Sequence, residues 1–198
     1  MTAQIFVLDT ETTGLGGALE GDVVVEIGIS RVDLDREKVY PEYGKIIRQE
    51  LTPAQQKSWV FENTDLTPED VANSPWLATD IRADLYSYAA GVFTAYNVDF
   101  DFGKYLRYPP WSFAPCIAPC IMCECADRYN EGRWFRAQEA YDLLCPDHPT
   151  GYRVEKHRAI HDAIYEGYIL LALCEKNPEI RERYIEAIEQ RDEYEYIY

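Results

Sequence analysis

The sequence contains no apolar run long enough to span a bilayer, and no basic segment precedes a hydrophobic stretch at its amino terminus. These two absences argue against a helical membrane anchor and a secretory leader, and we expect a cytoplasmic protein with no membrane partner. Positive charge is also scarce: 19 lysines and arginines stand against 35 aspartates and glutamates, for a net charge of −16. This balance is unusual for a protein that holds a polyanion on a basic surface.

The composition nevertheless indicates a folded chain. With 198 residues, 47% of them hydrophobic, the sequence is long and apolar enough for one domain with a substantial core. No internal repeat or linker divides it. We therefore expect one main domain over residues 1–176, followed by a C-terminal helix and an acidic, aromatic tail over residues 177–198.

The first chemically informative residues lie directly after an apolar run. Asp9 and Glu11 follow residues 5–8, which are typical of a buried strand, and their spacing places both side chains on one face of it. Two adjacent carboxylates repel each other unless a proton or a cation lies between them, and Mg²⁺ prefers oxygen ligands of this kind. The pair therefore indicates a metal site, although an isolated D-x-E is also common as the polar start of a loop.

Two later stretches carry further candidate residues. Asn97 and Asp101 follow the β-prone residues 92–96 and begin a segment with helical spacing. His157 and Asp162 lie at the start of an amphipathic helical pattern. Each stretch has an ordinary structural explanation, because acids favour the first turn of a helix and a lone histidine is usually a surface or cap residue. Their order after a D-x-E strand favours a functional explanation.

Together the three stretches resemble the DnaQ-like, DEDDh-type 3′–5′ exonucleases. The resemblance runs from Ile5 to about Leu173 and rests on L-D-T-E-T-T-G-L, N-V-D-F-D and H-R-A-I-H-D. The connecting residues 63–71 also resemble the family's G-I-T-x-E-x-V, with Asp65 where a glycine is common. The resemblance implies an α/β fold of the ribonuclease H-like kind, a mixed β-sheet flanked by α-helices on both faces.

The resemblance also implies a catalytic set, whose members are Asp9, Glu11, Asp101, Asp162 and His157. The four carboxylates would ligate two divalent cations, Mg²⁺ or Mn²⁺, which activate water and stabilise the leaving oxygen in phosphodiester hydrolysis. His157 would accept the proton of the attacking water, since imidazole titrates near neutral pH. The reaction would release nucleoside 5′-monophosphates from the 3′ end of a single-stranded nucleic acid, with DNA slightly favoured.

The other two histidines fit the role of general base less well. His161 adjoins Asp162, and neighbours on a helix point about 100° apart, so we expect its ring to face away from the metals. His148 lies in a turn-rich segment between Pro146 and Pro149. Only His157 has the family spacing.

Four residues are expected to contact the substrate. The resemblance implies that Thr12, Gly14 and Leu15 hold the 3′-terminal nucleotide, with Leu15 wedged beneath its base. A core position explains Leu15 equally well. Asn97 either orients the scissile phosphate or caps the following helix, and capping is the simpler interpretation. Tyr96 either stacks on a base or belongs to the core.

Six cysteines raise the question of a second metal site. Four of them lie close together: Cys116, Cys120, Cys123 and Cys125. Their spacing matches no common zinc pattern. The first three fall on one helical stripe, which indicates buried packing. A zinc site completed by Cys145 and His148 is the alternative, and disulfides are not expected without an export signal.

The coarse order of elements follows from periodicity and turn residues. We expect strands near residues 4–9, 22–33, 37–48 and 92–96. We expect helices near residues 76–90, 99–107, 118–129, 136–144 and 160–175, and a last helix over 178–189. We expect residues 194–198 to form a loose tail.

The acidic balance leaves three explanations open: short substrates held mainly through the metals, a basic protein partner that holds the nucleic acid, or a saline cytoplasm. A polymerase is one possible protein partner. Local cations are candidates for a basic rim: Arg107, Arg133, Arg136, Lys156 and Arg158. Two alternative functions also stay open. One is an RNA-trimming exoribonuclease of the same family, and the other is a non-catalytic or accessory subunit that binds a polymerase or nuclease complex.

Overall fold

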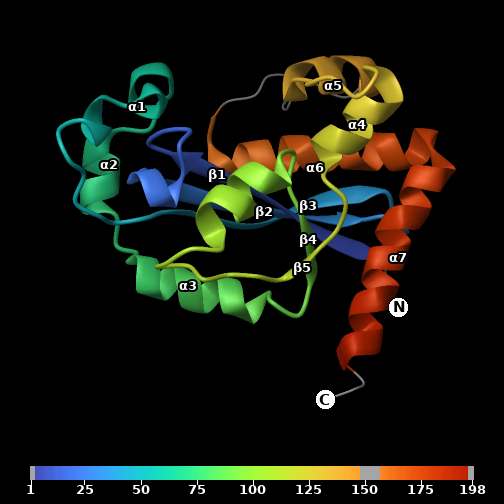
Figure 1. The fold of residues 1–198 in the computed structure, drawn as a ribbon, viewed down its shortest axis with the longest axis horizontal. Coiled ribbons are helices and arrows are strands. Elements are labelled where there is room, and N and C mark those ends of the chain that lie inside the picture. The colour runs from blue at the N-terminus through green and yellow to red at the C-terminus, as the bar shows by residue number, and fades with distance from the viewer. Residues whose placement is uncertain (1–2, 148–156, 196–198) are drawn as a thin grey trace.

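A five-stranded mixed sheet forms the centre of the protein (Figure 1). The computed structural model describes residues 3–147 and 157–195, with side chains as far as Arg191. The strands are β1 (Gln4–Thr12), β2 (Val24–Asp33), β3 (Lys38–Ile46), β4 (Val92–Thr94) and β5 (Cys116–Ile117). They lie in the order β3-β2-β1-β4-β5, and β1 is antiparallel to β2 and parallel to β4.

Helices cover both faces of this sheet. The helices are α1 (Trp59–Asn63), α2 (Pro68–Asn73), α3 (Ala78–Ser87), the π-type helix η3 (Asp99–Leu106), α4 (Ile121–Tyr129), α5 (Ala137–Leu144), α6 (Ala159–Lys176) and α7 (Pro178–Glu195). Two short 3₁₀ turns, η1 (Ala18–Glu20) and η2 (Gln55–Lys57), lie in the connections. One core cluster joins the sheet to α4, α5, α6 and α7, and another joins it to α3 and η3. The predicted α/β fold with helices on both faces is therefore confirmed.

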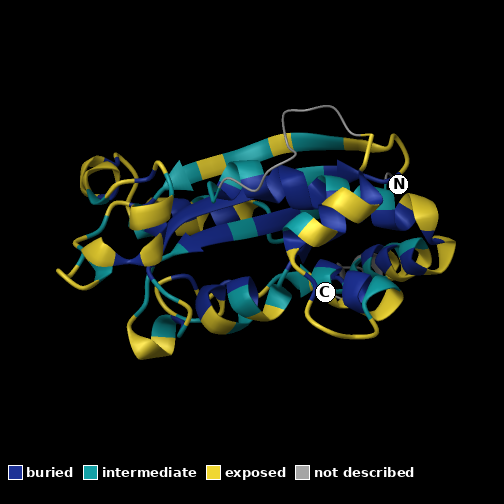
Figure 2. Ribbon diagram, turned by 90° about the horizontal axis from the view of Figure 1, so that it is seen from above, coloured by how far each residue is buried: buried dark blue, intermediate teal, exposed yellow. Residues whose placement is uncertain are grey.

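The alternation of β1 decides which side chains reach which face. Ile5 and Val7 are buried against the face covered by α6, whereas Leu8 belongs to the opposite cluster. Successive strand residues point to opposite faces, so an apolar run without interruption is what a strand buried on both sides requires. The same alternation carries Asp9 and Glu11 to the α6 face. Figure 2 shows the central strands as the most deeply buried part of the molecule.

Most predicted elements are present, but several differ from expectation: β1 ends at Thr12 rather than near residue 9, for example. The two-residue strand β5 was not expected, because it pairs with β4 over a length too short to leave a pattern. The short helices α1 and α2 were also not expected, although Thr67 caps α2 and exchanges hydrogen bonds with Asp70. Helix α4 starts at Ile121, three residues after the predicted position. Helix α7 continues to Glu195, so Tyr194 lies in a helix; residues 196–198 lie outside the described residues.

The expected stripe of buried cysteines is wrong. Cys116 lies in β5 and Cys120 directly precedes α4, so these two residues do not share a helix with Cys123. Cys123 is exposed, and Cys116 and Cys120 are half-buried. Among the described residues no cysteine joins a cluster that could hold a metal ion. His148, the other residue of the alternative zinc site, lies outside the described residues.

No helix in the described ranges combines the length and the apolar character needed to cross a membrane.

The contact between β2 and the start of α6 requires a glycine. A Cβ atom on Gly28 would lie 2.1 Å from the backbone carbon of Ala159, a separation that no rotamer change relieves. Gly44, its partner on β3, is less restricted, because its Cβ would meet the side chain of Ile160 at 2.8 Å. Glycine at position 28 therefore sets how closely α6 approaches the sheet.

We expect Gly28→Ala to lower the free energy of unfolding by about 3 kcal/mol, the upper range for overpacking a core. Gly44→Ala is the matched control and is expected to cost less than Gly28→Ala, because a side chain yields more easily than a helix backbone. Urea denaturation of both variants checks the order. An equal cost for the two substitutions would contradict the account of the close backbone contact.

Candidate active site

The nine residues that were expected to form the catalytic set and the substrate contacts line one cavity. Its volume is about 550 Å³, and it lies where the carboxyl end of β1 meets η3 and the start of α6. The five expected catalytic residues on its walls are Asp9, Glu11, Asp101, His157 and Asp162. The four expected substrate contacts on its walls are Thr12, Gly14, Leu15 and Asn97. Segments that are far apart in the chain therefore converge on a single site.

The backbone of β1 holds Asp101 in the cavity. Asp101 lies in the first turn of η3, and its Oδ1 accepts hydrogen bonds from the Thr10 amide at 3.0 Å and the Thr10 hydroxyl at 2.7 Å. Burial raises the pKa of Asp101 to about 7, although both hydrogen bonds from Thr10 act to lower it. The parallel pairing of β1 and β4 explains the contact, since neighbouring parallel strands end at the same edge.

Asp9 lies in surroundings that oppose its negative charge. The residue is partly buried, and its Oδ2 is shielded from solvent and has no hydrogen-bond partner among the described residues. Burial raises its pKa well above the ordinary value, and nearby carboxylates raise it further: Glu166, Glu11, Asp101 and Asp162. An unpaired buried carboxylate among other acids is costly unless a cation neutralises it.

The donor set fits a hard divalent cation. Glu11, His157 and Asp162 each offer one ligand atom, and the three atoms lie within 4.8 Å of one another. With the free oxygen of Asp9, these residues supply mostly carboxylate oxygen, which Mg²⁺ and Mn²⁺ prefer. The site therefore has the chemistry of a metal centre.

A network at the start of α6 fixes the position of Asp162. The Arg158 guanidinium donates to both carboxylate oxygens of Glu26 on β2, at 2.9 and 2.8 Å. The Ala159 amide donates to Glu26 at 3.2 Å, and the Arg158 amide donates to Asp162 Oδ2 at 3.1 Å. The backbone at the start of α6 therefore binds Asp162, and the hydrogen bonds to Glu26 fix this helix start against β2.

The expected basic rim is not assembled at this cavity. Arg158 is paired with Glu26 and Asp65, and Arg133 with Glu131 at 3.5 Å. Neither of these arginines nor Arg136 is among the residues that line the cavity. Lys156 lies outside the described residues, and Arg107 lines an adjoining cavity.

The two described histidines occupy different places. His157 has a positive φ of 52°, an uncommon conformation outside glycine, and its ring meets the ring of Trp59 edge-on at 4.7 Å. His161 does not line the cavity, as expected, but its Nδ1 lies 3.0 Å from Asp162 Oδ1. The contact between His161 and Asp162 was not predicted, because the angle between helix neighbours does not describe where a flexible ring turns.

Sequence reasoning missed Glu166. It is 5% exposed, lines the same cavity, and accepts a hydrogen bond from the Tyr96 amide at 3.1 Å. The available signal was its spacing, since residues four apart on a helix lie on the same face, and Asp162 is four positions earlier. The site therefore contains a fifth carboxylate beside the four expected ones.

The substrate-contact candidates can now be placed. Leu15 is 77% exposed, so the core explanation for it is wrong. Tyr96 belongs to the core, where its hydroxyl donates to the carbonyl of Phe135 at 2.7 Å. Asn97 accepts from the Phe100 amide at 3.3 Å, which is a capping contact, while also lining the cavity.

The loop that contains Gly14 and Leu15 is held in place by hydrogen bonds to the carbonyls of these two residues. The hydroxyls of Thr12 and Tyr105 both donate to the Gly14 carbonyl, at 2.7 and 2.6 Å. Lys104 Nζ donates to the Leu15 carbonyl at 2.9 Å. The loop therefore holds the exposed Leu15 side chain at a fixed place on the cavity wall.

Comparison with known proteins is consistent with this arrangement. The RNase_T family model, described as "Exonuclease", matches residues 6–170. No curated protein sequence matches the chain significantly. Among solved structures, exonuclease X in complex with 5′ overhanging duplex DNA is 21% identical, with a TM-score of 0.61 over 88% of this chain and 93% of that chain.

Two further solved structures share the fold. The nuclease domain of 3′hExo, a DEDDh family member bound to rAMP, is 13% identical, with a TM-score of 0.64 over 89% of this chain and 94% of that one. The zinc-bound form of the E. coli ExoI–ssDNA complex is 16% identical, with a TM-score of 0.64 over 92% of this chain. The alignment covers 42% of the ExoI chain, so the similarity is confined to part of that protein.

Proposed function

Because the chain belongs to the exonuclease family, we propose that it is a metal-dependent 3′–5′ exonuclease of the DEDDh type, which releases nucleoside 5′-monophosphates from a single-stranded 3′ end. One observation supports this most strongly: four carboxylates and a histidine from three separate segments line one cavity. A solvated cluster of acids on a surface would not explain why the Oδ2 atom of Asp9 is buried without a hydrogen-bond partner.

The residues divide the work of phosphodiester hydrolysis. Bound divalent cations, Mg²⁺ or Mn²⁺, supply water activation and stabilisation of the leaving oxygen. Asp9, Glu11 and Asp162 offer the oxygens that would hold them, and Thr10 fixes the orientation of Asp101. His157 accepts the proton of the attacking water from its place on the cavity wall.

The terminal nucleotide would be held by residues 12–15, which line the same cavity. Leu15 presents an exposed apolar side chain that would lie beneath the base, while the backbone of Thr12 and Gly14 would contact the sugar. Asn97 would orient the scissile phosphate in addition to its capping role. The structural neighbours include complexes with DNA and with rAMP, so both polymers belong in the first assay, with DNA as the favoured substrate.

The direct test incubates 5′-labelled single-stranded DNA and RNA with the protein and Mg²⁺ or Mn²⁺. We expect a ladder of products that shortens from the 3′ end and disappears with EDTA, because carboxylates without cations cannot activate water. The faster polymer identifies the substrate class. Folded protein that shortens neither strand in the presence of metal would refute the proposed activity.

The same assay tests the choice of general base. We expect His157→Gln to lower kcat by roughly 10²- to 10⁴-fold, the usual contribution of a general base. His161→Gln is the matched control, since His161 touches Asp162 without lining the cavity, and it should cost less. A larger loss for His161→Gln than for His157→Gln would reassign the base.

A further inference from the structure

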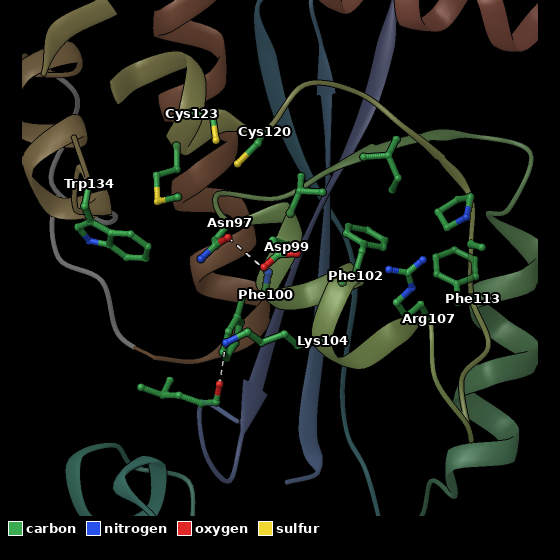
Figure 3. A pocket seen from close by; sticks show the side chains of 17 residues that line it. Asn97, Asp99, Phe100, Phe102, Lys104, Arg107, Phe113, Cys120, Cys123 and Trp134 are labelled. Carbon is green, nitrogen blue, oxygen red and sulfur yellow. Dashed lines mark hydrogen bonds between the residues drawn. The ribbon is translucent and has the colours of Figure 1, made fainter. Parts of the chain in front are cut away.

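A second and larger cavity adjoins the candidate active site. We call it the Lys104 groove; its volume is about 830 Å³, and its walls include Phe100, Lys104, Arg107, Cys120, Cys123 and Trp134 (Figure 3). Four lining residues are common to both cavities: Leu15, Asn97, Phe100 and Trp134. The Lys104 groove is therefore a continuation of the active-site cavity.

The walls of the groove suit a nucleic acid strand in both shape and charge. Phe100 and Trp134 provide aromatic surfaces, and Trp134 is well exposed. Lys104 and Arg107 are exposed cations, and neither forms an ion pair with a carboxylate in the described ranges. Asp99 is the acidic residue on these walls. The groove thus carries a local positive surplus on a chain with a net charge of −16.

Leu15 marks the boundary between the two cavities. Its side chain lines both, and its carbonyl accepts a hydrogen bond from Lys104 Nζ at 2.9 Å. If the base of the 3′-terminal nucleotide contacts Leu15 in the active-site cavity, the preceding base of the strand lies on the other side of Leu15, in the groove. With the 3′ end in the active site, the strand therefore runs toward its 5′ end along the groove.

We propose that the Lys104 groove binds the nucleotides that precede the 3′-terminal one on the same strand. Their bases would pack against Phe100 and Trp134, and their phosphates would be neutralised by Lys104 and Arg107. Aromatic faces accept any base that is free of a partner strand, so the groove selects a single strand over a mononucleotide ester. This inference rests on the proposed exonuclease activity.

The test compares two substrates that differ only in whether they reach the groove. One is a single-stranded hexanucleotide. The other is the p-nitrophenyl ester of a nucleoside 5′-monophosphate, with thymidine or uridine chosen by the polymer assay. We expect Arg107→Glu to raise KM for the hexanucleotide about tenfold, because it replaces a phosphate contact by repulsion. Cleavage of the ester should not change, since Arg107 does not line the active-site cavity.

Arg82→Glu is the matched control. Arg82 is exposed on α3 and lines neither cavity. Its guanidinium lies 5.4 Å from the centre of the Tyr86 ring, and that of Arg107 lies 6.0 Å from the centre of the Tyr108 ring. It changes the net charge by the same amount. The salt dependence adds a second readout: for Arg107→Ala the slope of log KM against log salt should fall by about 0.7, the value for one lost single-strand phosphate contact.

The groove cysteines give a test that leaves every charged side chain in place. Cys120 and Cys123 lie on the wall, and Cys123 is exposed. Treatment with N-ethylmaleimide should add bulk to the groove and raise KM for the hexanucleotide, but not for the ester. The variant Cys120→Ser/Cys123→Ser should not respond to the reagent, which separates the groove from other thiols such as Cys116.

The outcomes are distinct. If Arg107→Glu and Arg82→Glu have the same effect on the hexanucleotide, the groove is not a strand site, while the exonuclease stands. If Arg107→Glu slows both substrates equally, Arg107 supports the active site itself and the inference is overturned. If the unmodified protein cleaves neither substrate, the proposed activity fails and the inference falls with it.

Discussion

Replacing Asp9 with asparagine is expected to abolish exonuclease activity and at the same time to stabilise the metal-free protein. The loss of activity follows from the position of Asp9, which lines the same cavity as Glu11 and Asp162 and has an oxygen without a hydrogen-bond partner. Removing one metal-ligand charge should cost several kcal/mol of transition-state stabilisation, or roughly 10³-fold in kcat or more.

The gain in stability has a separate cause. Burial and four neighbouring acids raise the pKa of Asp9, so its ionised form destabilises the folded chain when no cation is bound. An asparagine of the same shape carries no charge, and its amide can donate to a neighbouring carboxylate. We expect a gain of about 2 kcal/mol, which corresponds to roughly 5 °C in the melting temperature of a chain of this length.

Both effects can be measured on the same sample. Kinetics with the labelled strand gives the loss of kcat, and thermal denaturation in EDTA gives the change in stability. Asp127→Asn is the matched control, because Asp127 is an exposed carboxylate outside the cavity, and it should change neither quantity appreciably. If Asp9→Asn lowered the melting temperature of the metal-free protein, Asp9 would be a structural carboxylate rather than a ligand awaiting a cation.

The sequence was most informative where the signal is local. The alternation of β1 and the two-residue spacing of Asp9 and Glu11 depend only on strand geometry, and the structure has both side chains in one cavity. The boundaries of α6 were also close to those expected, because a helix with eleven buried positions leaves a strong pattern. Convergence of the three motifs needed more than local pattern, and it came from the resemblance to a known family.

What the sequence did not predict depends on contacts between distant segments. Glu166 follows Asp162 by about one helical turn, but that spacing does not show that Glu166 accepts a hydrogen bond from the distant Tyr96 amide. The two-residue strand β5 exists only because β4 offers an edge to pair with, and it breaks the helix that the cysteine spacing had suggested. The exposure of Leu15 is likewise set by Tyr105 and Lys104, whose hydrogen bonds hold its loop outward.

The metal-free protein is expected to lose stability as the pH rises from about 4 to about 7 (the range between an ordinary carboxyl pKa and that of Asp101). Burial raises the pKa of Asp101 from 3.8 to about 7, and the pKa of Asp9 is raised by burial as well. In this range the folded state therefore binds more protons than the unfolded state. Stability is then fully present below pH 3.8 for these two groups and falls as they ionise, by a few kcal/mol in total.

Other carboxyls act in the opposite direction but at lower pH. Burial opposes ionisation of Asp33, yet the Arg36 amide and guanidinium hold the pKa of Asp33 below its ordinary value of 3.8. Lys45 does the same for Asp84. The stability that Asp33 and Asp84 contribute is lost only as the pH falls through their lowered pKa values. The metal-free protein should therefore be most stable near pH 4 to 5. Proteins that lack such a cluster of acids are usually most stable between about pH 5 and 8.

Urea denaturation in EDTA between pH 4.5 and 8 measures this profile, and a second series with Mg²⁺ measures the effect of the cation. Mg²⁺ competes with protons for the same oxygens, so its stabilising effect should be small at pH 4.5 and large at pH 8. Asp101→Asn should flatten the metal-free profile, because it removes a group with a raised pKa without changing its shape. A metal-free stability that rises steadily from pH 4.5 to 8 would show that Asp9 and Asp101 are not the groups that make the empty site costly.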